Sequence, residues 1–174
     1  MRTSEICDIR VATGEDARTI LEVRRASWQI AYADVFPAAR LAEMSVEPWL
    51  QWWEDAIRNP EPHMRTLVAE VAGHLVAYAQ LGVARGESDP QTGELYGIYA
   101  HPGAWGSGVG RVLMTDALTG LRDEGFLDAI LWVLEENARA RRFYEHAGWT
   151  ADGGVKDEQW LEKLVREVRY RIAL

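Results

Sequence analysis

The spacing of apolar residues predicts a mixed order of strands and helices along the chain. Residues 6–11 alternate weakly between apolar and polar side chains and fit an opening strand. Apolar positions then recur at helical spacing up to residue 32, after a capping pair formed by Thr13 and Asp16. A second helix is expected over residues 46–58, where tryptophans mark one face. The first third of the chain is therefore predicted to be a strand followed by two helices.

The pattern changes to that of strands after this region. Residues 66–82 are rich in small and β-branched side chains and fit a hairpin that turns at Ala72 and Gly73. The remaining predicted elements are a third antiparallel strand at 94–100, a helix at 109–124, a strand at 128–134, a short helix at 138–147 and a closing strand near 163–172. The strand at 128–134 is apolar on both faces, which is typical of a sheet centre covered on both sides.

Length, charge and cysteine content narrow the class of protein. The 174 residues, 48% of them hydrophobic, fit one domain over residues 1–174. A formal charge of -8 would repel a phosphate backbone, so we expect no nucleic-acid partner. No run of 18 apolar residues is present, residues 1–15 lack the apolar stretch of a signal peptide, and Cys7 has no second cysteine to pair with. We therefore expect a cytoplasmic protein with no membrane partner.

Four glycines join the strand at 94–100 directly to the next helix. They are Gly103, Gly106, Gly108 and Gly110, within HPGAWGSGVGRVLM. Glycine lets the backbone turn tightly and approach a ligand closely, and the free N–H groups at a helix start attract an anion. The alternative is a turn that only connects two elements. The position between a strand and a helix favours an anion-binding loop.

Two other phosphate loops do not fit this segment. The spacing from Gly103 to Gly108 matches a P-loop, but Val109 and Gly110 stand where a P-loop has lysine and a hydroxyl residue. A dinucleotide-binding fingerprint would need a third glycine where the chain has Arg111, and the strands before the loop form a hairpin. A nucleotide-binding or dinucleotide-binding enzyme is therefore disfavoured.

Two segments resemble the GNAT N-acetyltransferases. Residues 94–114, ELYGIYAHPGAWGSGVGRVLM, look like the acetyl-CoA-binding signature of that family, and ENARARRFYEHAGW at 136–149 is similar to its second cofactor segment. Trp105 departs from the pattern, because the family has Arg or Gln at that place. The likeness covers nearly the whole chain and implies a GNAT-like α/β (α+β) fold. Such a fold has a mixed central sheet of six to seven strands, helices on both faces and a splayed strand pair that holds acetyl-CoA.

The resemblance also implies a coenzyme site. It places the pantetheine arm along the backbone of residues 98–100 and the pyrophosphate on N–H groups of residues 106–111. The implied binding residues are Ile98, Tyr99, Ala100, Trp105, Gly106, Ser107, Gly108, Val109, Gly110, Arg111, Asn137 and Tyr144. Asn137 would hold the pantetheine amide, cap the following helix, or do both. Trp105 would either stack on the coenzyme or shield the loop.

Acetyl transfer to an amine requires two proton transfers. An ammonium group with a pKa of about 10.4 is the free amine only about once in 2,500 molecules at pH 7, so a base is useful. The resemblance points to Glu94 as that base, with Tyr96, His101 and Glu135 as substitutes. Tyr144 matches the family's acid tyrosine and would protonate the departing thiolate, since an ordinary tyrosine is protonated at neutral pH.

The acceptor side is expected to be lined from the first helices. Trp28, Tyr32 and Phe36 are the predicted acceptor-binding residues. The sequence thus predicts an N-acetyltransferase that acetylates a primary amine of a small molecule or peptide by direct attack, without a metal. The alternative is a non-catalytic acyl-CoA sensor or interaction module with the same fold. An exposed edge of the terminal strands would allow a homodimer.

Overall fold

The computed structural model describes residues 7–174, so Ile6 of the predicted first strand lies outside the described residues. The helices are α1 (Ala17–Ala31), α2 (Ala38–Ala42), α3 (Glu47–Arg58), α4 (Val109–Asp123) and α5 (Ala138–His146). The strands are β1 (Cys7–Val11), β2 (Arg65–Val71), β3 (His74–Val83), β4 (Thr92–Ala100), β5 (Asp128–Leu134), β6 (Thr150–Trp160) and β7 (Lys163–Ala173). Every element predicted within this range is present. The sequence pattern did not place the short helix α2 or the strand β6.

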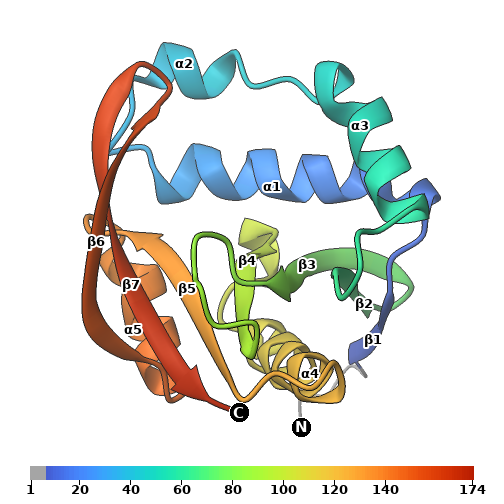
Figure 1. Ribbon diagram of the computed structural model, residues 1–174. Helices are drawn as coiled ribbons and strands as arrows, with labels where there is room; N and C mark the ends of the chain where they lie inside the picture. Colours follow the sequence, from blue (N-terminus) through green and yellow to red (C-terminus); the bar gives the residue numbers. More distant parts are fainter. Residues whose placement is uncertain (1–6) are drawn as a thin grey trace, which may run out of the picture.

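All seven strands belong to one mixed sheet, in the order β1-β2-β3-β4-β5-β7-β6. Neighbouring strands are antiparallel except β4 and β5, which run parallel. Helices α1 and α3 lie on one face of the sheet, and α4 and α5 lie on the other (Figure 1). The predicted α/β (α+β) class, with helices on both faces of a mixed sheet, is confirmed.

The parallel pair β4 and β5 separates after three residues. The two strands pair only from Thr92 to Glu94 on β4 and from Asp128 to Ile130 on β5. The register between β4 and β3 shifts at Tyr96, which is an extra residue on β4 and forms a β-bulge. A bulge bends its strand and increases its twist. The bend carries the rest of β4 away from β5, so the predicted splayed pair is present.

Apolar side chains hold each helix layer to the sheet. On the α4 and α5 face, a large core includes Leu113, Leu121 and Trp149, which are almost completely buried. On the other face, α1 and α3 pack over β2 and β3 around Ile20 and Trp53. Burying large apolar side chains contributes roughly 1.5–3 kcal/mol each. These two layers fix the positions of α1 and α5 on opposite sides of the opening in the sheet.

The start of α1 is fixed by the predicted capping pair. The Asp16 carboxylate accepts a hydrogen bond from the Thr13 backbone N–H at 2.7 Å. Arg10 in β1 donates two hydrogen bonds to the same carboxylate, at 2.7 and 2.8 Å, and thereby holds the pKa of Asp16 below its ordinary value. The cap sits on a short 3-10 turn that leads into α1. None of the helices within residues 7–174 is long and apolar enough to cross a membrane.

Candidate active site

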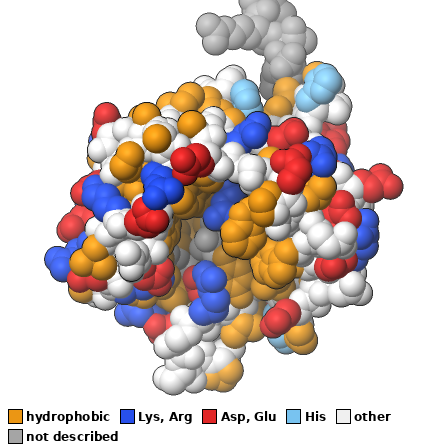
Figure 2. Space-filling view, turned by 90° about the horizontal axis from the view of Figure 1, so that it is seen from above, with side chains coloured by type: hydrophobic (Ala, Val, Ile, Leu, Met, Phe, Trp, Pro, Cys, Tyr) orange, Lys and Arg blue, Asp and Glu red, His pale blue; other side chains and the backbone are white. Residues whose placement is uncertain are grey.

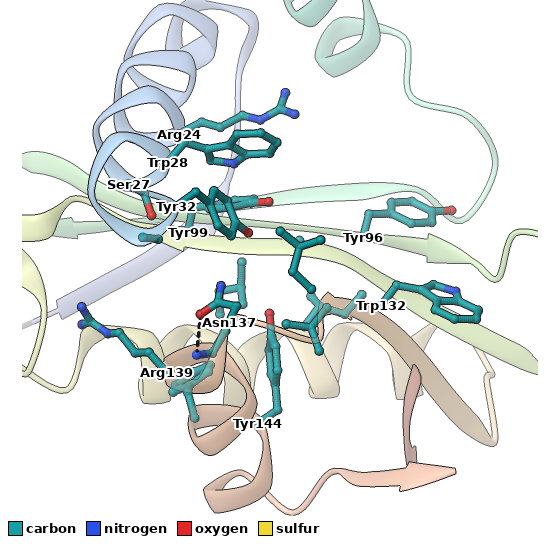
Figure 3. Close-up of a pocket in the computed structure, with 18 of the residues that line it drawn as sticks. Arg24, Ser27, Trp28, Tyr32, Tyr96, Tyr99, Trp132, Asn137, Arg139 and Tyr144 are labelled. Carbon is teal, nitrogen blue, oxygen red and sulfur yellow. Dashed lines mark hydrogen bonds between the residues drawn. The ribbon is translucent and has the colours of Figure 1, made fainter. Parts of the chain in front are cut away.

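A cavity of about 1300 Å³ runs through the opening between β4 and β5. Its walls come from α1 on one face of the sheet, from β4 and β5 at the opening, and from α4 and α5 on the other face. Side chains from α1 and α5 extend into this space from opposite sides (Figure 3). The cavity therefore connects the two faces of the sheet, so a molecule bound against α4 can meet one bound against α1.

The free edge of β4 faces this cavity. The backbone N–H of His101 donates to a carbonyl of β3 at 2.7 Å, and backbone groups alternate in direction along an antiparallel strand. Tyr99 therefore directs its backbone groups towards β3, whereas Ile98 and Ala100 direct theirs towards the opening. The carbonyl of Ala100 accepts a hydrogen bond from the indole N–H of Trp105 at 2.8 Å. The N–H and C=O of Ile98 and the N–H of Ala100 remain available on this edge.

The glycine loop turns sharply into α4 at the edge of the cavity. Gly106 and Gly108 have φ angles of 77° and 95°, in the left-handed region where side chains are strained. The residues of the loop and of the first turn of α4 that line the cavity are Ala104, Trp105, Gly106, Gly108, Val109, Gly110 and Arg111. Ser107 does not line it, because its hydroxyl turns back and donates to the Ala104 carbonyl at 2.7 Å. Among the loop N–H groups, that of Ser107 donates to the Ala104 carbonyl, that of Val109 to the Ser107 hydroxyl and that of Arg111 to the Gly108 carbonyl. The N–H groups of Gly106, Gly108 and Gly110 have no acceptor within residues 7–174 and remain free for an anion.

Asn137 and Tyr144 extend from α5 into the same cavity. The Asn137 side-chain oxygen accepts a hydrogen bond from the Ala140 backbone N–H at 3.0 Å, which confirms the predicted helix cap. The Asn137 side chain also lies beside the Tyr32 hydroxyl; burial raises the pKa of Tyr32, and the hydrogen bond from Asn137 opposes that shift. Tyr144 is buried, and its hydroxyl points into the cavity (Figure 3). Burial raises the pKa of Tyr144 above its ordinary value, and nearby Tyr99 raises it further. Tyr144 therefore keeps its proton throughout the neutral range.

Glu94 lies at the last paired position of β4 and is only 2% exposed. Its carboxylate accepts hydrogen bonds from the Arg85 backbone N–H at 2.8 Å and from the Arg85 guanidinium at 2.7 and 3.3 Å. Both carboxylate oxygens are thus already held by one arginine. The guanidinium of Arg85 also lies 4.3 Å from the centre of the Tyr96 ring.

The predicted substitutes for Glu94 are placed differently. Tyr96 lines the cavity, but its hydroxyl donates to the Val83 carbonyl at 2.6 Å. The His101 ring accepts from the Gly103 backbone N–H, and neither His101 nor Glu135 lines the cavity. Of the four predicted bases, Glu94 and Tyr96 are the two that the fold brings to the opening.

Glu167 on β7 is a cavity residue that sequence reasoning missed. It is 4% exposed and pairs with Lys156 on β6 at 3.0 Å. Burial raises the pKa of Glu167 above its ordinary value, although Lys156 opposes the shift. Burial also raises the pKa of Tyr32, and the nearby charge of Glu167 adds a smaller contribution. An acidic residue at an inward-facing position of a strand is a signal that the sequence contains. The position of Glu167 at the cavity, however, follows from its pairing with Leu134 of β5, which the sequence does not show.

Aromatic residues form the α1 side of the cavity. Trp28 and Tyr32 line it, as predicted, and Trp160 from the end of β6 stacks on Trp28 with ring centres 5.2 Å apart. Phe36 does not line this cavity. It is 3% exposed and packs behind Trp28, because the chain leaves α1 before reaching it. Viewed from the side of α2 and α3, the molecular surface is hollowed in the middle, with hydrophobic and basic side chains around the hollow (Figure 2).

An opening between two parallel strands, a glycine loop against it and a tyrosine at its centre define an acetyltransferase of the GNAT class. The profile of the acetyltransferase (GNAT) family matches residues 22–149, which is more than half of the chain. The chain therefore belongs to this family.

Several relatives and solved structures are similar to it. Mycothiol acetyltransferase of Beutenbergia cavernae is 50% identical over 62 residues, 36% of this chain and 21% of that protein. The chain thus spans about a fifth of the length of that relative. The uncharacterized N-acetyltransferase YuaI of Bacillus subtilis is 27% identical over 129 residues, 74% of this chain and 72% of YuaI.

The structural neighbours share the fold. PaiA N-acetyltransferase of Thermoplasma acidophilum, solved in complex with coenzyme A, has a TM-score of 0.75 at 21% identity and covers 97% of this chain and 99% of its own. YncA of Salmonella typhimurium, solved with its cofactor acetyl-CoA, has a TM-score of 0.73 at 20% identity and covers 97% of this chain and 94% of its own.

Proposed function

We propose that this protein transfers the acetyl group of acetyl-CoA to a primary amine of a small molecule or peptide by direct attack. The observation that carries the proposal is the cavity through the sheet, which brings the free edge of β4, the glycine loop and Tyr144 to one place. Two structural neighbours, PaiA and YncA, were solved with coenzyme A and acetyl-CoA, which supports the choice of coenzyme.

The residues on the α4 side fit the chemical groups of acetyl-CoA. Ile98 and Ala100 offer backbone groups on an open strand edge, which suits the amides of the pantetheine arm. The loop before and into α4 offers the free N–H groups of Gly106, Gly108 and Gly110, which suit the pyrophosphate. The Asn137 side chain faces the same space, beside the Tyr32 hydroxyl. Acetyl-CoA supplies the acetyl group as a thioester.

The chain's own residues would supply the two proton transfers. The amine nitrogen forms a bond to the acetyl carbonyl carbon while the bond from that carbon to sulfur breaks. A buried carboxylate takes the proton that the amine loses. Tyr144, kept protonated by its burial, gives a proton to the sulfur and later regains one from water. Cys7 lies in β1 at the far edge of the sheet, which agrees with direct attack rather than a cysteine intermediate.

Three carboxylates line the cavity, and the base is one of the two that are buried, because Glu158 is exposed. Glu94 is the candidate from the sequence, and Glu167 is the candidate that the structure adds. Arg85 occupies both oxygens of Glu94, whereas the protein contact of Glu167 is the Lys156 amine. Burial also raises the pKa of Glu167, which brings a carboxylate closer to the range where it accepts a proton well at neutral pH. These contacts favour Glu167 as the base.

The proposal is tested with acetyl-CoA and a panel of amines, following both product formation and coenzyme binding. Replacing Tyr144 by Phe should lower kcat by about 10² to 10⁴, because the thiolate then leaves without its proton donor. The coenzyme Kd should change little, since the ring stays in place. Equal turnover by wild type and Tyr144→Phe would remove Tyr144 from this role.

The same experiment addresses the alternative function. A wild-type protein that binds acetyl-CoA tightly but acetylates none of the amines would be a sensor or interaction module. If the protein does not bind acetyl-CoA at all, both the acetyltransferase and the sensor hypotheses are contradicted.

A further inference from the structure

Trp105 stands where the family has a polar side chain, and its contacts show how the chain uses it. Its indole N–H donates to the Ala100 carbonyl at 2.8 Å, so the ring is fixed across the end of β4. Trp105 is half-buried and lines the cavity beside the glycine loop. The ring is thus a rigid surface at the place where the loop meets the coenzyme cavity.

Arg139, in the first turn of α5, lies on the face of this ring. Its guanidinium carbon is 3.5 Å from the centre of the Trp105 ring, the shortest such contact within residues 7–174. Arg139 also lines the cavity. Arg139 is exposed to solvent, no carboxylate within residues 7–174 pairs with it, and desolvation by the neighbouring atoms lowers its pKa. The result is an exposed cation that is held on an aromatic face and has no carboxylate partner within residues 7–174.

We propose that Arg139, held in place by Trp105, binds a phosphate group of the coenzyme. The proposal rests on the proposed use of acetyl-CoA. Stacking uses the flat face of the guanidinium and leaves its N–H donors free in the plane. Those donors match two oxygens of one phosphate. Arg139 on α5 thereby supplies the charged side chain that the loop lacks at Trp105.

The other arginines of α5 are not available for this role. Arg141 donates to the Tyr170 hydroxyl at 3.1 Å and to the Glu135 carbonyl at 3.1 Å. Arg142 is exposed and does not line the cavity. Arg142→Ala is therefore a matched control, since it removes the same charge from the same helix.

The test is the affinity for free coenzyme A, measured by calorimetry without any acceptor. A hydrogen-bonded charge of this kind is worth roughly ten- to a hundredfold in affinity, so Arg139→Ala should raise the Kd by that factor. Arg142→Ala should stay within about twofold of wild type, since it touches nothing in the cavity. An unchanged Kd for Arg139→Ala would overturn the proposal.

Coenzyme lacking the ribose 3′-phosphate identifies which phosphate is bound. If Arg139 binds the pyrophosphate, Arg139→Ala weakens dephospho-coenzyme A as much as coenzyme A. If it binds the 3′-phosphate, the two proteins bind dephospho-coenzyme A equally. Either result supports a phosphate contact. A wild type that binds no coenzyme A would instead contradict the proposed function itself, so the two failures are distinguishable.

The role of Trp105 is tested by a double-mutant cycle. Trp105→Leu removes the ring that holds the guanidinium and should weaken coenzyme binding in the same direction as Arg139→Ala. The double variant should bind no more weakly than the weaker single variant, because the two residues act as one unit. Fully additive losses would show that Trp105 does not position Arg139. Thermal melting of each variant confirms that it is folded.

Discussion

At the scale of single residues, two buried carboxylates face one cavity and differ in what already holds them. Glu94 is enclosed by Arg85 through its backbone N–H and its guanidinium, so it ties the loop after β3 to β4. Glu167 is held by Lys156, which also pairs with exposed Glu158 at 2.9 Å. Lys156 therefore keeps a partner if Glu167 is neutralised. The two carboxylates are expected to differ in function for this reason.

Neutralising each carboxylate in turn shows whether Glu94 or Glu167 is the base. Glu167→Gln should lower kcat/KM by about 10² to 10⁴ at neutral pH, because the amine then loses its proton acceptor. The deficit should shrink as pH rises towards the pKa of the amine, where the free amine is abundant. Glu158→Gln is the matched control, since it shares Lys156 but is exposed. A large loss in Glu94→Gln alone would return the role to Glu94.

At the scale of elements, the site depends on two irregular backbone features. The bulge at Tyr96 ends the pairing of β4 with β5 and leaves a strand edge free. The left-handed glycines turn the chain so that the first turn of α4 points at that edge. Neither feature belongs to a regular helix or strand, and both bring backbone groups rather than side chains to the cavity. An acidic chain can therefore hold an anionic coenzyme without a large basic patch.

A methyl group at Gly108 tests the loop. The residue has φ 95°, so Gly108→Ala should cost about 1–2 kcal/mol in the free energy of unfolding and weaken coenzyme binding. Gly125, at the other end of α4, has φ 90° and an open surround, which makes Gly125→Ala a matched control. The control should lose similar stability in denaturant titrations but keep the wild-type Kd. Equal Kd values for both variants would argue against the loop as a coenzyme site.

At the scale of the whole molecule, the sheet consists of two parts joined by a short seam. Strands β1 to β4 form one part, β5, β7 and β6 form the other, and three residue pairs connect β4 to β5. A coenzyme lying along β4 in the opening would contact both parts. Its binding should therefore stabilise the entire fold rather than one loop.

Thermal melting measures this stabilisation. Acetyl-CoA at about 100 times its Kd should add about 2.7 kcal/mol and raise Tm by roughly 5–10 °C. An amine that is a true acceptor should raise Tm further in the presence of coenzyme A, since the cavity connects both faces of the sheet. ATP and NAD serve as controls and should give no shift. A shift with either of them but none with acetyl-CoA would contradict the site.

The sequence predicted the regular elements of the fold well because their patterns are local. The apolar periods placed α1, α3, α4 and β5 within a few residues of their observed ends, and the Thr13 and Asp16 cap is present. The strand β6 escaped prediction because Gly153 and Gly154 interrupt its alternation, where its register with β7 shifts. The helix α2 is only five residues long, which is too short for a helical period to show.

For the candidate site as well, some residues could be predicted from local sequence and others only from the tertiary structure. The glycine loop, Asn137 and Tyr144 lie in continuous motifs, so the sequence by itself singled them out as candidates, and the fold brings them to one cavity. Only the fold decided that Glu167 faces the cavity, that Phe36 does not, and that Arg139 stacks on Trp105. Those relations join residues that are distant in the chain or lie on different elements. They depend on strand register and helix packing, which no local pattern specifies.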